Sequence, residues 1–248
     1  MKGSPGASAV WHDPLVVTGA TRRVIVGGLA IAYREAGQPA DPPMVLLHAM
    51  GEAAVSWEPV LADLANLGYR AIALDARGHG DSDRPGAYSY ELLRDDVLDV
   101  LDALRIDRCV LVGHSMGATT AGLVTAAASD RVSALVLEDA VPPRPGSLDR
   151  PPLPRPDKEL PFDWPLVNAL RAQLTNPDPA WWEDAKHITV PTLVIAGGAP
   201  SHIPQADLHE LAAVLVNGRL AEIAVGHQVH VHAPLEFVAA IRSFLADL

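Results

Sequence analysis

The chain has 248 residues, of which 49% are hydrophobic and 20% charged, a composition that can bury a full core and excludes a disordered protein. This length suits one α/β domain. The formal net charge of −11, with no stretch that gathers Lys or Arg into a basic face, argues against nucleic acid as a partner.

The sequence contains one cysteine, Cys109, which excludes an internal disulfide framework. Its place in an apolar run predicts a buried side chain rather than a reactive thiol. No apolar run approaches the ~18 residues that a membrane span needs, and no apolar segment follows Lys2 as in a secretory leader. We therefore expect a cytoplasmic protein without a membrane partner.

Short apolar runs alternate with helical patterns, an order typical of a mostly parallel sheet with helices on both faces. Apolar residues spaced three and four apart predict helices over residues 57–67, 93–104 and 234–245. We expect eight strands, at residues 23–26, 30–35, 43–48, 70–74, 109–112, 134–138, 192–196 and 220–225.

The segment after the sixth expected strand is rich in proline. Nine of the 22 prolines fall between Pro142 and Pro165, and this density cannot continue a strand or a helix. Helical patterns return at residues 164–174 and 180–187. We expect residues 141–187, the cap segment, to cover the carboxyl ends of the strands within a single domain of residues 1–248.

The pentapeptide Gly-His-Ser-Met-Gly, residues 113–117, lies between the fifth expected strand and a helical pattern. A Gly-x-Ser-x-Gly nucleophile elbow requires this context, because a strained serine there exposes its hydroxyl at a turn too sharp for side chains at the glycines. Ser115 is therefore the predicted nucleophile. The N–H of Met116, at a helix N-terminus, is placed to stabilise an oxyanion. The alternative is a glycine-rich turn without chemistry.

A serine hydroxyl needs a base to remove its proton, and in an elbow fold the base comes last in the chain. His227 follows the last expected strand and precedes the last expected helix. We predict His227 as this base, the alternative being a solvent-exposed loop histidine.

Several segments together resemble the α/β-hydrolase superfamily, over residues 22–248: residues 45–51 before the first helix, residues 75–82 after the next strand, the Ser115 elbow, and residues 226–230. The resemblance implies an α/β-hydrolase fold, hydrolase activity on a small-molecule substrate, and no cofactor. It also implies a second oxyanion donor at the N–H of Met50. Ala49 replaces the glycine of the usual His-Gly pair, and alanine tolerates positive φ less well.

In relatives a third catalytic residue, an acid, orients the histidine. It commonly lies in the loop after the seventh strand, but residues 197–204 contain no carboxylate. Asp207 falls in the following helix, where we expect it to point away from the site. Other relatives, such as haloalkane dehalogenases, use the end of the sixth strand, where Glu138 and Asp139 stand. Neighbouring strand residues face opposite sides, so one of the two is expected to orient His227. We prefer Glu138, because an aspartate at the position of Asp139 is common in relatives whose acid lies elsewhere.

The histidines His227, His230 and His232 form a His-x-x-His-x-His cluster similar to metal-binding patterns. No carboxylate or cysteine completes a recognised spacing, so we predict no metal site. Further polar residues flank these loops, and we expect them to hold the turns by hydrogen bonds: His48, His114, Asp75, Arg77 and His79. Five bulky cap residues are candidates for an apolar wall over Ser115 or for anchors of the cap: Phe162, Trp164, Leu166, Trp181 and Trp182.

We predict a cofactor-independent serine hydrolase that cleaves a small, largely apolar carboxylic ester or lactone through an acyl-enzyme. Ser115 attacks, His227 transfers the proton and Glu138 orients His227, while the N–H groups of Met50 and Met116 hold the oxyanion. The same fold also serves C–C hydrolases, perhydrolases, lyases or cyclases, and non-enzymatic ligand-binding modules, and these alternatives stay open.

Overall fold

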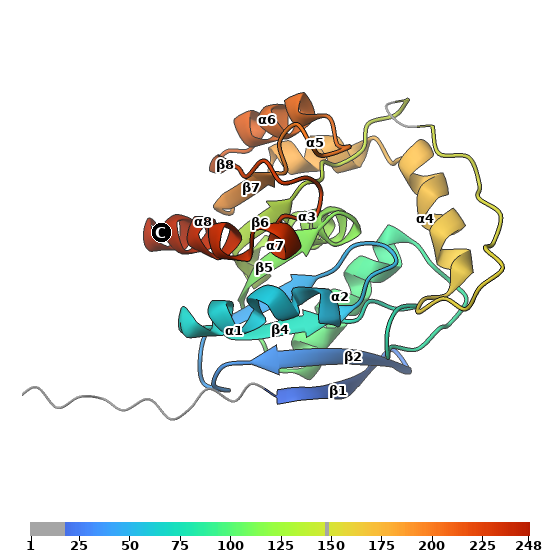
Figure 1. Cartoon of the computed structure of the whole chain (residues 1–248), viewed down its shortest axis with the longest axis horizontal. Coiled ribbons are helices and arrows are strands. Elements are labelled where there is room, and N and C mark those ends of the chain that lie inside the picture. Colours follow the sequence, from blue (N-terminus) through green and yellow to red (C-terminus); the bar gives the residue numbers. More distant parts are fainter. Residues whose placement is uncertain (1–17, 147–148) are drawn as a thin grey trace, which may run out of the picture.

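The computed structural model describes residues 18–146 and 149–248. In this part of the chain an eight-stranded sheet has the order β1-β2-β4-β3-β5-β6-β7-β8 (Figure 1). The strand β2 pairs antiparallel with both β1 and β4, and the strands from β4 to β8 run parallel. This arrangement confirms the predicted mostly parallel sheet of the α/β-hydrolase fold. The strands are β1 Thr18–Val26, β2 Leu29–Ala36, β3 Pro43–Leu47, β4 Arg70–Leu74, β5 Cys109–His114, β6 Val132–Glu138, β7 Thr192–Ala196 and β8 Gly218–Glu222.

Helices cover both faces of the sheet, because successive residues of a strand point to opposite sides and both sides are apolar. Val45 and Leu47 of β3 pack into the core cluster formed with α2, α3 and α6. Met44 and Leu46 pack into the opposite cluster, with α1 and α8. These helices are α1 Glu58–Asn66, α2 Tyr90–Ala103, α3 Met116–Ala127, α6 Gln205–Val214 and α8 Pro234–Ala246, with the short helices η1 Ala54–Trp57, η2 Ser129–Arg131 and α7 Val229–His232 between them.

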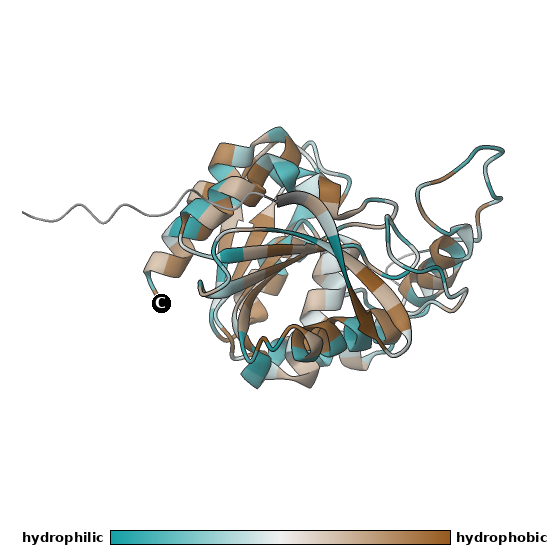
Figure 2. Cartoon of the chain, turned by 90° about the horizontal axis from the view of Figure 1, so that it is seen from below, coloured by the Kyte–Doolittle hydropathy of each residue, from teal (hydrophilic) through white to brown (hydrophobic). Residues whose placement is uncertain are grey.

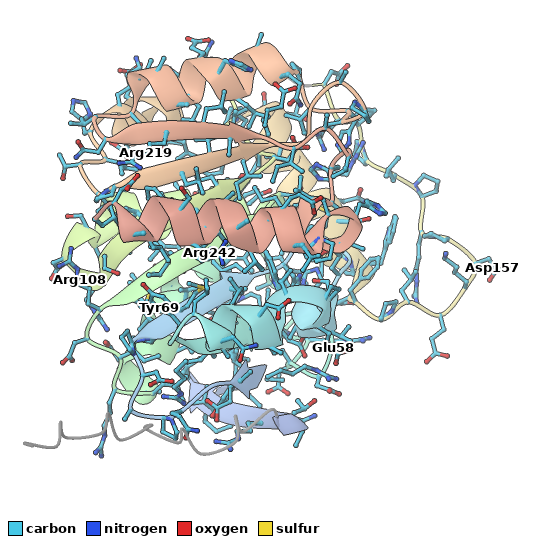
Figure 3. The ribbon with its side chains drawn as sticks, turned by 60° about the vertical axis from the view of Figure 1, so that its left-hand side comes forward. Glu58, Tyr69, Arg108, Asp157, Arg219 and Arg242 are labelled. Atoms are coloured by element: carbon cyan, nitrogen blue, oxygen red, sulfur yellow. The ribbon has the colours of Figure 1, made fainter. Side chains whose placement is uncertain are left out.

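The cap segment adds two helices between β6 and β7, namely α4 Trp164–Thr175 and α5 Ala180–Lys186. Its proline-rich part projects from the body as a loop, seen at the right of Figure 2 and marked by Asp157 in Figure 3. Leu166 and Leu170 of α4 join a third apolar cluster with Tyr90 and Met116. Apolar packing therefore attaches α4 of the cap segment to α2 and α3.

The sequence predicted that Cys109 is buried and that no segment spans a membrane, and the structure bears on both predictions. Cys109 is buried at the start of β5, and burial raises the pKa of its thiol to about 12, which confirms a packing role. Within residues 18–146 and 149–248, every helix is too short or too polar to cross a membrane.

Candidate active site

Ser115 lies at the turn between β5 and α3 with φ 52° and ψ −111°, a left-handed conformation that is costly for a residue with a side chain. Its backbone N–H donates to the carbonyl oxygen of Glu138 on the neighbouring strand, at 3.1 Å. Strain of this kind persists only where the surrounding structure enforces it. Ser115 thus stands at a strained turn between a strand and a helix, as the sequence predicts.

The two glycines of the elbow are required by close backbone approach. A Cβ atom on Gly113 would lie 2.3 Å from the carbonyl oxygen of Gly117. A Cβ atom on Gly117 would lie 2.0 Å from the carbonyl oxygen of Leu47. Neither distance is compatible with a side chain, so these positions let α3 pack against β3 and β5 immediately after the serine.

His227 is oriented by Asp139. The ring Nδ1 of His227 lies 2.8 Å from Oδ2 of Asp139, whose side chain is completely buried. The same Oδ2 accepts from the hydroxyl of Ser201, and Oδ1 accepts from the backbone N–H of Gly197 at 2.8 Å. Three donors therefore hold the carboxylate in one orientation, with one oxygen directed at the imidazole.

The electrostatics keep Asp139 ionised. Burial raises its pKa, but hydrogen bonds from His227, Ser201 and Gly197 lower it by more, so the pKa of Asp139 lies below its ordinary value. An ionised aspartate on Nδ1 leaves Nε2 of His227 as the nitrogen that can accept a proton.

The prediction that Glu138 orients His227 is wrong. Both carboxylate oxygens of Glu138 lie on Nδ1 of His230 instead, at 2.9 and 2.8 Å, and one also accepts the backbone N–H of His230. Asp139 follows the last residue of β6 with φ 46°, which turns its side chain toward the loop after β7. A signal for this was present in the sequence, since Gly197 and Ser201 supply donors in the loop that lacks a carboxylate.

The structure brings the Ser115 elbow together with residues 223–232, which follow β8 and include His227 and His230 (the histidine loop). His114, which precedes Ser115, donates from Nε2 to the backbone carbonyl of His227 at 2.9 Å, and the two rings lie 4.6 Å apart. The ring of His202 lies 4.3 Å from that of His227, and His202 and Ser115 line the same cavity. His227, which bonds to Asp139, therefore contacts a residue of the cavity that Ser115 lines.

The two predicted oxyanion donors lie in different segments, Met50 in the loop after β3 and Met116 at the start of α3. Met116 begins α3, so its N–H is one of the first-turn amides that have no acceptor inside the helix. On either side of Met50 the amides are used, Ala49 donating to Glu52 at 3.3 Å and Gly51 to His79 at 3.1 Å. Positive φ in this loop falls on Gly51, at 83°, and not on Ala49, so the alanine is accommodated without strain.

Two buried neutral histidines hold the loop around Met50. His48 accepts the N–H of Ala76 on Nε2 at 3.0 Å and donates from Nδ1 to the carbonyl of Ala49 at 2.7 Å. His79 accepts from Gly51 on Nε2 and donates from Nδ1 to the carbonyl of Arg77 at 3.1 Å. Burial lowers the pKa of His48, and burial with the nearby His48 lowers the pKa of His79 to about 3.

The other residues expected to hold the turns do so. Asp75 accepts the backbone N–H of Ala54 at 2.6 Å and that of Asp81 at 2.9 Å. The guanidinium of Arg77 pairs with the carboxylate of Asp96 on α2. Asp75 thus connects the loops after β3 and β4, and Arg77 connects the loop after β4 to α2, which agrees with the predicted hydrogen-bonding roles.

A cavity of about 220 Å³ opens beside Ser115, between the elbow, the start of the cap segment and the loop after β7. Asp207 lies in α6 as predicted, but it borders this cavity, so the expectation that it points away from the site is wrong. The reason is its place in the first turn of α6, directly after a loop that lines the cavity.

The bulky cap residues divide between the two predicted roles. Trp182 lines the cavity and stacks under the guanidinium of Arg144 at 3.7 Å. Trp181 packs edge-on against Tyr90, with ring centroids 5.3 Å apart, and Leu166 is buried in the same cluster. Phe162 and Trp164 pack at the border of that cluster. One residue therefore forms a wall of the cavity, and the others anchor the cap segment.

Comparison with known proteins agrees with this fold. Residues 42–198 match the model of the alpha/beta hydrolase fold family. Because the match covers more than half of the chain, the protein belongs to the alpha/beta hydrolase fold family.

Its curated relatives are hydrolases of several kinds. Epoxide hydrolase 4 of Mus musculus is 35% identical over 132 residues, covering 52% of this chain and 36% of that protein. Esterase YbfF of Escherichia coli (strain K12) is 27% identical over 243 residues, covering 84% of this chain and 94% of the esterase. The chain thus spans about a third of the length of the epoxide hydrolase and nearly all of the esterase.

Solved structures show the same fold. The thioesterase domain from the curacin biosynthetic pathway aligns with a TM-score of 0.74 and 22% identity, covering 92% of this chain and 98% of that domain. Epoxide Hydrolase A from Mycobacterium thermoresistibile aligns with a TM-score of 0.73 and 25% identity, covering 92% of this chain and 98% of that chain.

Proposed function

We propose that the protein is a serine hydrolase that cleaves a small, largely apolar carboxylic ester or lactone through an acyl-enzyme on Ser115. The observation that supports it most is the hydrogen bond from His227 to the buried Asp139, at the same end of the sheet as the strained Ser115. An aspartate, an imidazole and a serine hydroxyl that borders a cavity are the parts of a nucleophilic triad.

In the proposed reaction His227 removes the proton of Ser115 through Nε2 while the serine oxygen attacks the carbonyl carbon. The negative charge on the carbonyl oxygen is held by the N–H groups of Met50 and Met116. The tetrahedral intermediate collapses, and His227 returns the proton to the leaving alcohol. Water then attacks the acyl-serine by the same steps, and Asp139 stabilises the imidazolium in both halves.

The serine at the elbow favours acyl transfer over epoxide opening, although several curated relatives are named epoxide hydrolases. Attack of a serine oxygen on an epoxide carbon would form an ether. An ether has no carbonyl at which water can add, so this site could not release it by the steps above. An acyl-serine is an ester, and the same machinery can hydrolyse it.

The cavity supports a small substrate. Its volume of about 220 Å³ lies below the 300–1,000 Å³ of drug-sized pockets. Val141, Pro142, Leu174 and Trp182 give it apolar walls. We propose that residues 141–187 act as the cap that closes over the bound acyl group.

A cytoplasmic location stays a prediction from the sequence.

Turnover of short-chain p-nitrophenyl esters tests the proposal, together with labelling of Ser115 by a fluorophosphonate. We expect a burst of nitrophenol, a labelled Ser115, and loss of nearly all turnover in Ser115→Ala. Ser129→Ala, at an exposed serine, is the matched control and should behave as the parent. Parent-level turnover in Ser115→Ala would refute the assignment. A labelled Ser115 without ester turnover would favour a C–C hydrolase or another reaction of this fold. Absence of labelling would favour a binding module.

A further inference from the structure

Behind the Ser115 elbow, three side chains from distant parts of the chain meet. They are Glu52 in the loop after β3, His114 at the end of β5, and His230 in α7. One ligand-type atom from each lies within 4.8 Å of the other two. His114 and His230 are completely buried.

Their hydrogen bonds determine which ring nitrogens carry protons. Nδ1 of His230 faces the carboxylate of Glu138 at 2.8 Å, and Nε2 of His114 faces the carbonyl oxygen of His227 at 2.9 Å. Both partners are acceptors, so these two nitrogens are protonated and donate. The lone pairs of neutral rings then lie on His230 Nε2 and His114 Nδ1. Both atoms are buried and have no hydrogen-bond partner among the described residues.

This pattern matches the surroundings of metal-bound histidines, which donate their second ring N–H to a carboxylate or a backbone carbonyl. Nδ1 of His114 lies 3.6 Å from Oε2 of Glu52. That distance is too long for a hydrogen bond, but it is close to the ~3.4 Å between two ligand atoms of a tetrahedral ion with bonds of ~2.1 Å. The other oxygen of Glu52 accepts from Gln228 at 2.6 Å, which fixes the carboxylate.

The local charge also favours a cation. Glu138 lies 2.8 Å from Nδ1 of His230, and Glu52 lies 3.6 Å from Nδ1 of His114. Two carboxylates next to two imidazoles attract a positive ion as they attract a proton.

We infer that Glu52, His114 and His230 bind one divalent transition-metal ion, with zinc the best match to two imidazoles and one carboxylate. The ion would link the loop of Met50, the elbow and the histidine loop, and so act as a structural link behind the catalytic residues. The sequence predicted no metal site because the His-x-x-His-x-His cluster lacked a carboxylate. Here the carboxylate comes from Glu52, and neither His227 nor the exposed His232 takes part.

The test uses the full chain purified without a histidine tag, stripped with a chelator, incubated with zinc chloride and desalted. Bound metal is then measured by mass spectrometry of the elements. We expect about one zinc per chain in the parent and at least a tenfold loss in Glu52→Gln and in His230→Gln. His209→Gln, at a histidine whose side chain is 55% exposed, is the matched control and should keep the zinc. Circular dichroism melting checks that each variant is folded.

Calorimetric titration of the stripped parent with zinc chloride gives a measurement that does not depend on any variant. Saturable uptake at a ratio near one supports the inference. A parent that takes up no zinc would overturn it. Zinc that stays bound in folded Glu52→Gln and His230→Gln would overturn it too, because the ion would then lie elsewhere.

Discussion

The adjacent acids Glu138 and Asp139 contact different histidines because the backbone turns between them. Glu138 is the last residue of β6 and bonds to His230, whereas Asp139 has φ 46° and reaches His227. The sequence predicted that one acid at this strand end would contact His227, and alternation along the strand could not say which. The deciding feature is a left-handed residue, and aspartate is among the few types with a side chain that adopt this conformation readily.

We expect Asp139→Asn to lower kcat on a p-nitrophenyl ester by about 10³–10⁴-fold, because an amide on Nδ1 no longer stabilises the imidazolium. Glu138→Gln is the matched neighbour, and we expect its kcat to fall less than tenfold. Steady-state kinetics of the two variants distinguish the assignments. A larger loss in Glu138→Gln than in Asp139→Asn would restore Glu138 as the acid.

His79 gives a prediction about pH and stability. Its pKa is lowered to about 3 in the folded chain, whereas an unfolded histidine has a pKa of about 6.5. Below pH 6.5 the unfolded state binds the proton first, so protonation favours unfolding as the pH falls toward 3. The free energy of unfolding of the parent should therefore fall more steeply than that of His79→Gln, by at most about 1.4 kcal/mol per pH unit. Urea unfolding between pH 7 and 4.5 measures this, and parallel curves would contradict it.

At the scale of elements, the pattern of apolar residues predicted where strands lie but was less accurate for the residues at which they begin and end. The apolar run predicts that the fifth strand ends at residue 112. In the structure β5 continues to His114, because Gly113 and His114 pair with Leu137 and Glu138 of β6. β8 covers Gly218–Glu222, shifted from the expected residues 220–225, since its register with β7 is set by backbone pairing. The ends of a strand depend on the residues with which it pairs, and the sequence of that strand alone does not identify these partners.

The packing of α3 against β3 gives a second pair of variants. Gly117→Ala would place Cβ 2.0 Å from a backbone oxygen, so we expect it to destabilise the fold by about 3 kcal/mol or more. Gly122→Ala lies in the same helix with no atom within 4 Å of the new Cβ. It should stabilise the chain by about 0.5–1 kcal/mol, since alanine favours helix. Thermal unfolding of both variants checks the pair, and equal effects would show that the close contact is not limiting.

At the scale of the whole molecule, the mostly parallel eight-stranded sheet and the insertion after β6 followed from the sequence, whereas contacts between distant loops did not. Glu52, His114 and His230 are far apart in the chain, so no local spacing indicates that they meet. The lining of the cavity likewise combines residues from separate segments. Trp182 precedes β7 in the chain and Asp207 follows it, and both line the cavity. Residue types and periods predict elements, but tertiary packing decides which of their side chains share a site.

The cap segment provides the prediction at this scale. Trp182→Leu shortens a wall of the cavity, so we expect the ratio of kcat/KM for an octanoyl over an acetyl p-nitrophenyl ester to rise by about tenfold. Trp164→Leu, at a cap tryptophan that does not line this cavity, is the control and should leave the ratio unchanged. An unchanged ratio in Trp182→Leu would mean that the acyl chain binds elsewhere.

Ser201 and His227 share a single oxygen of Asp139, although Ser201 belongs to the loop after the next strand. A carboxylate introduced at position 201 would therefore start beside the same imidazole. A lineage could gain the second acid first and lose Asp139 afterwards, so that the triad changes its connectivity along the chain while the geometry around the histidine is inherited intact.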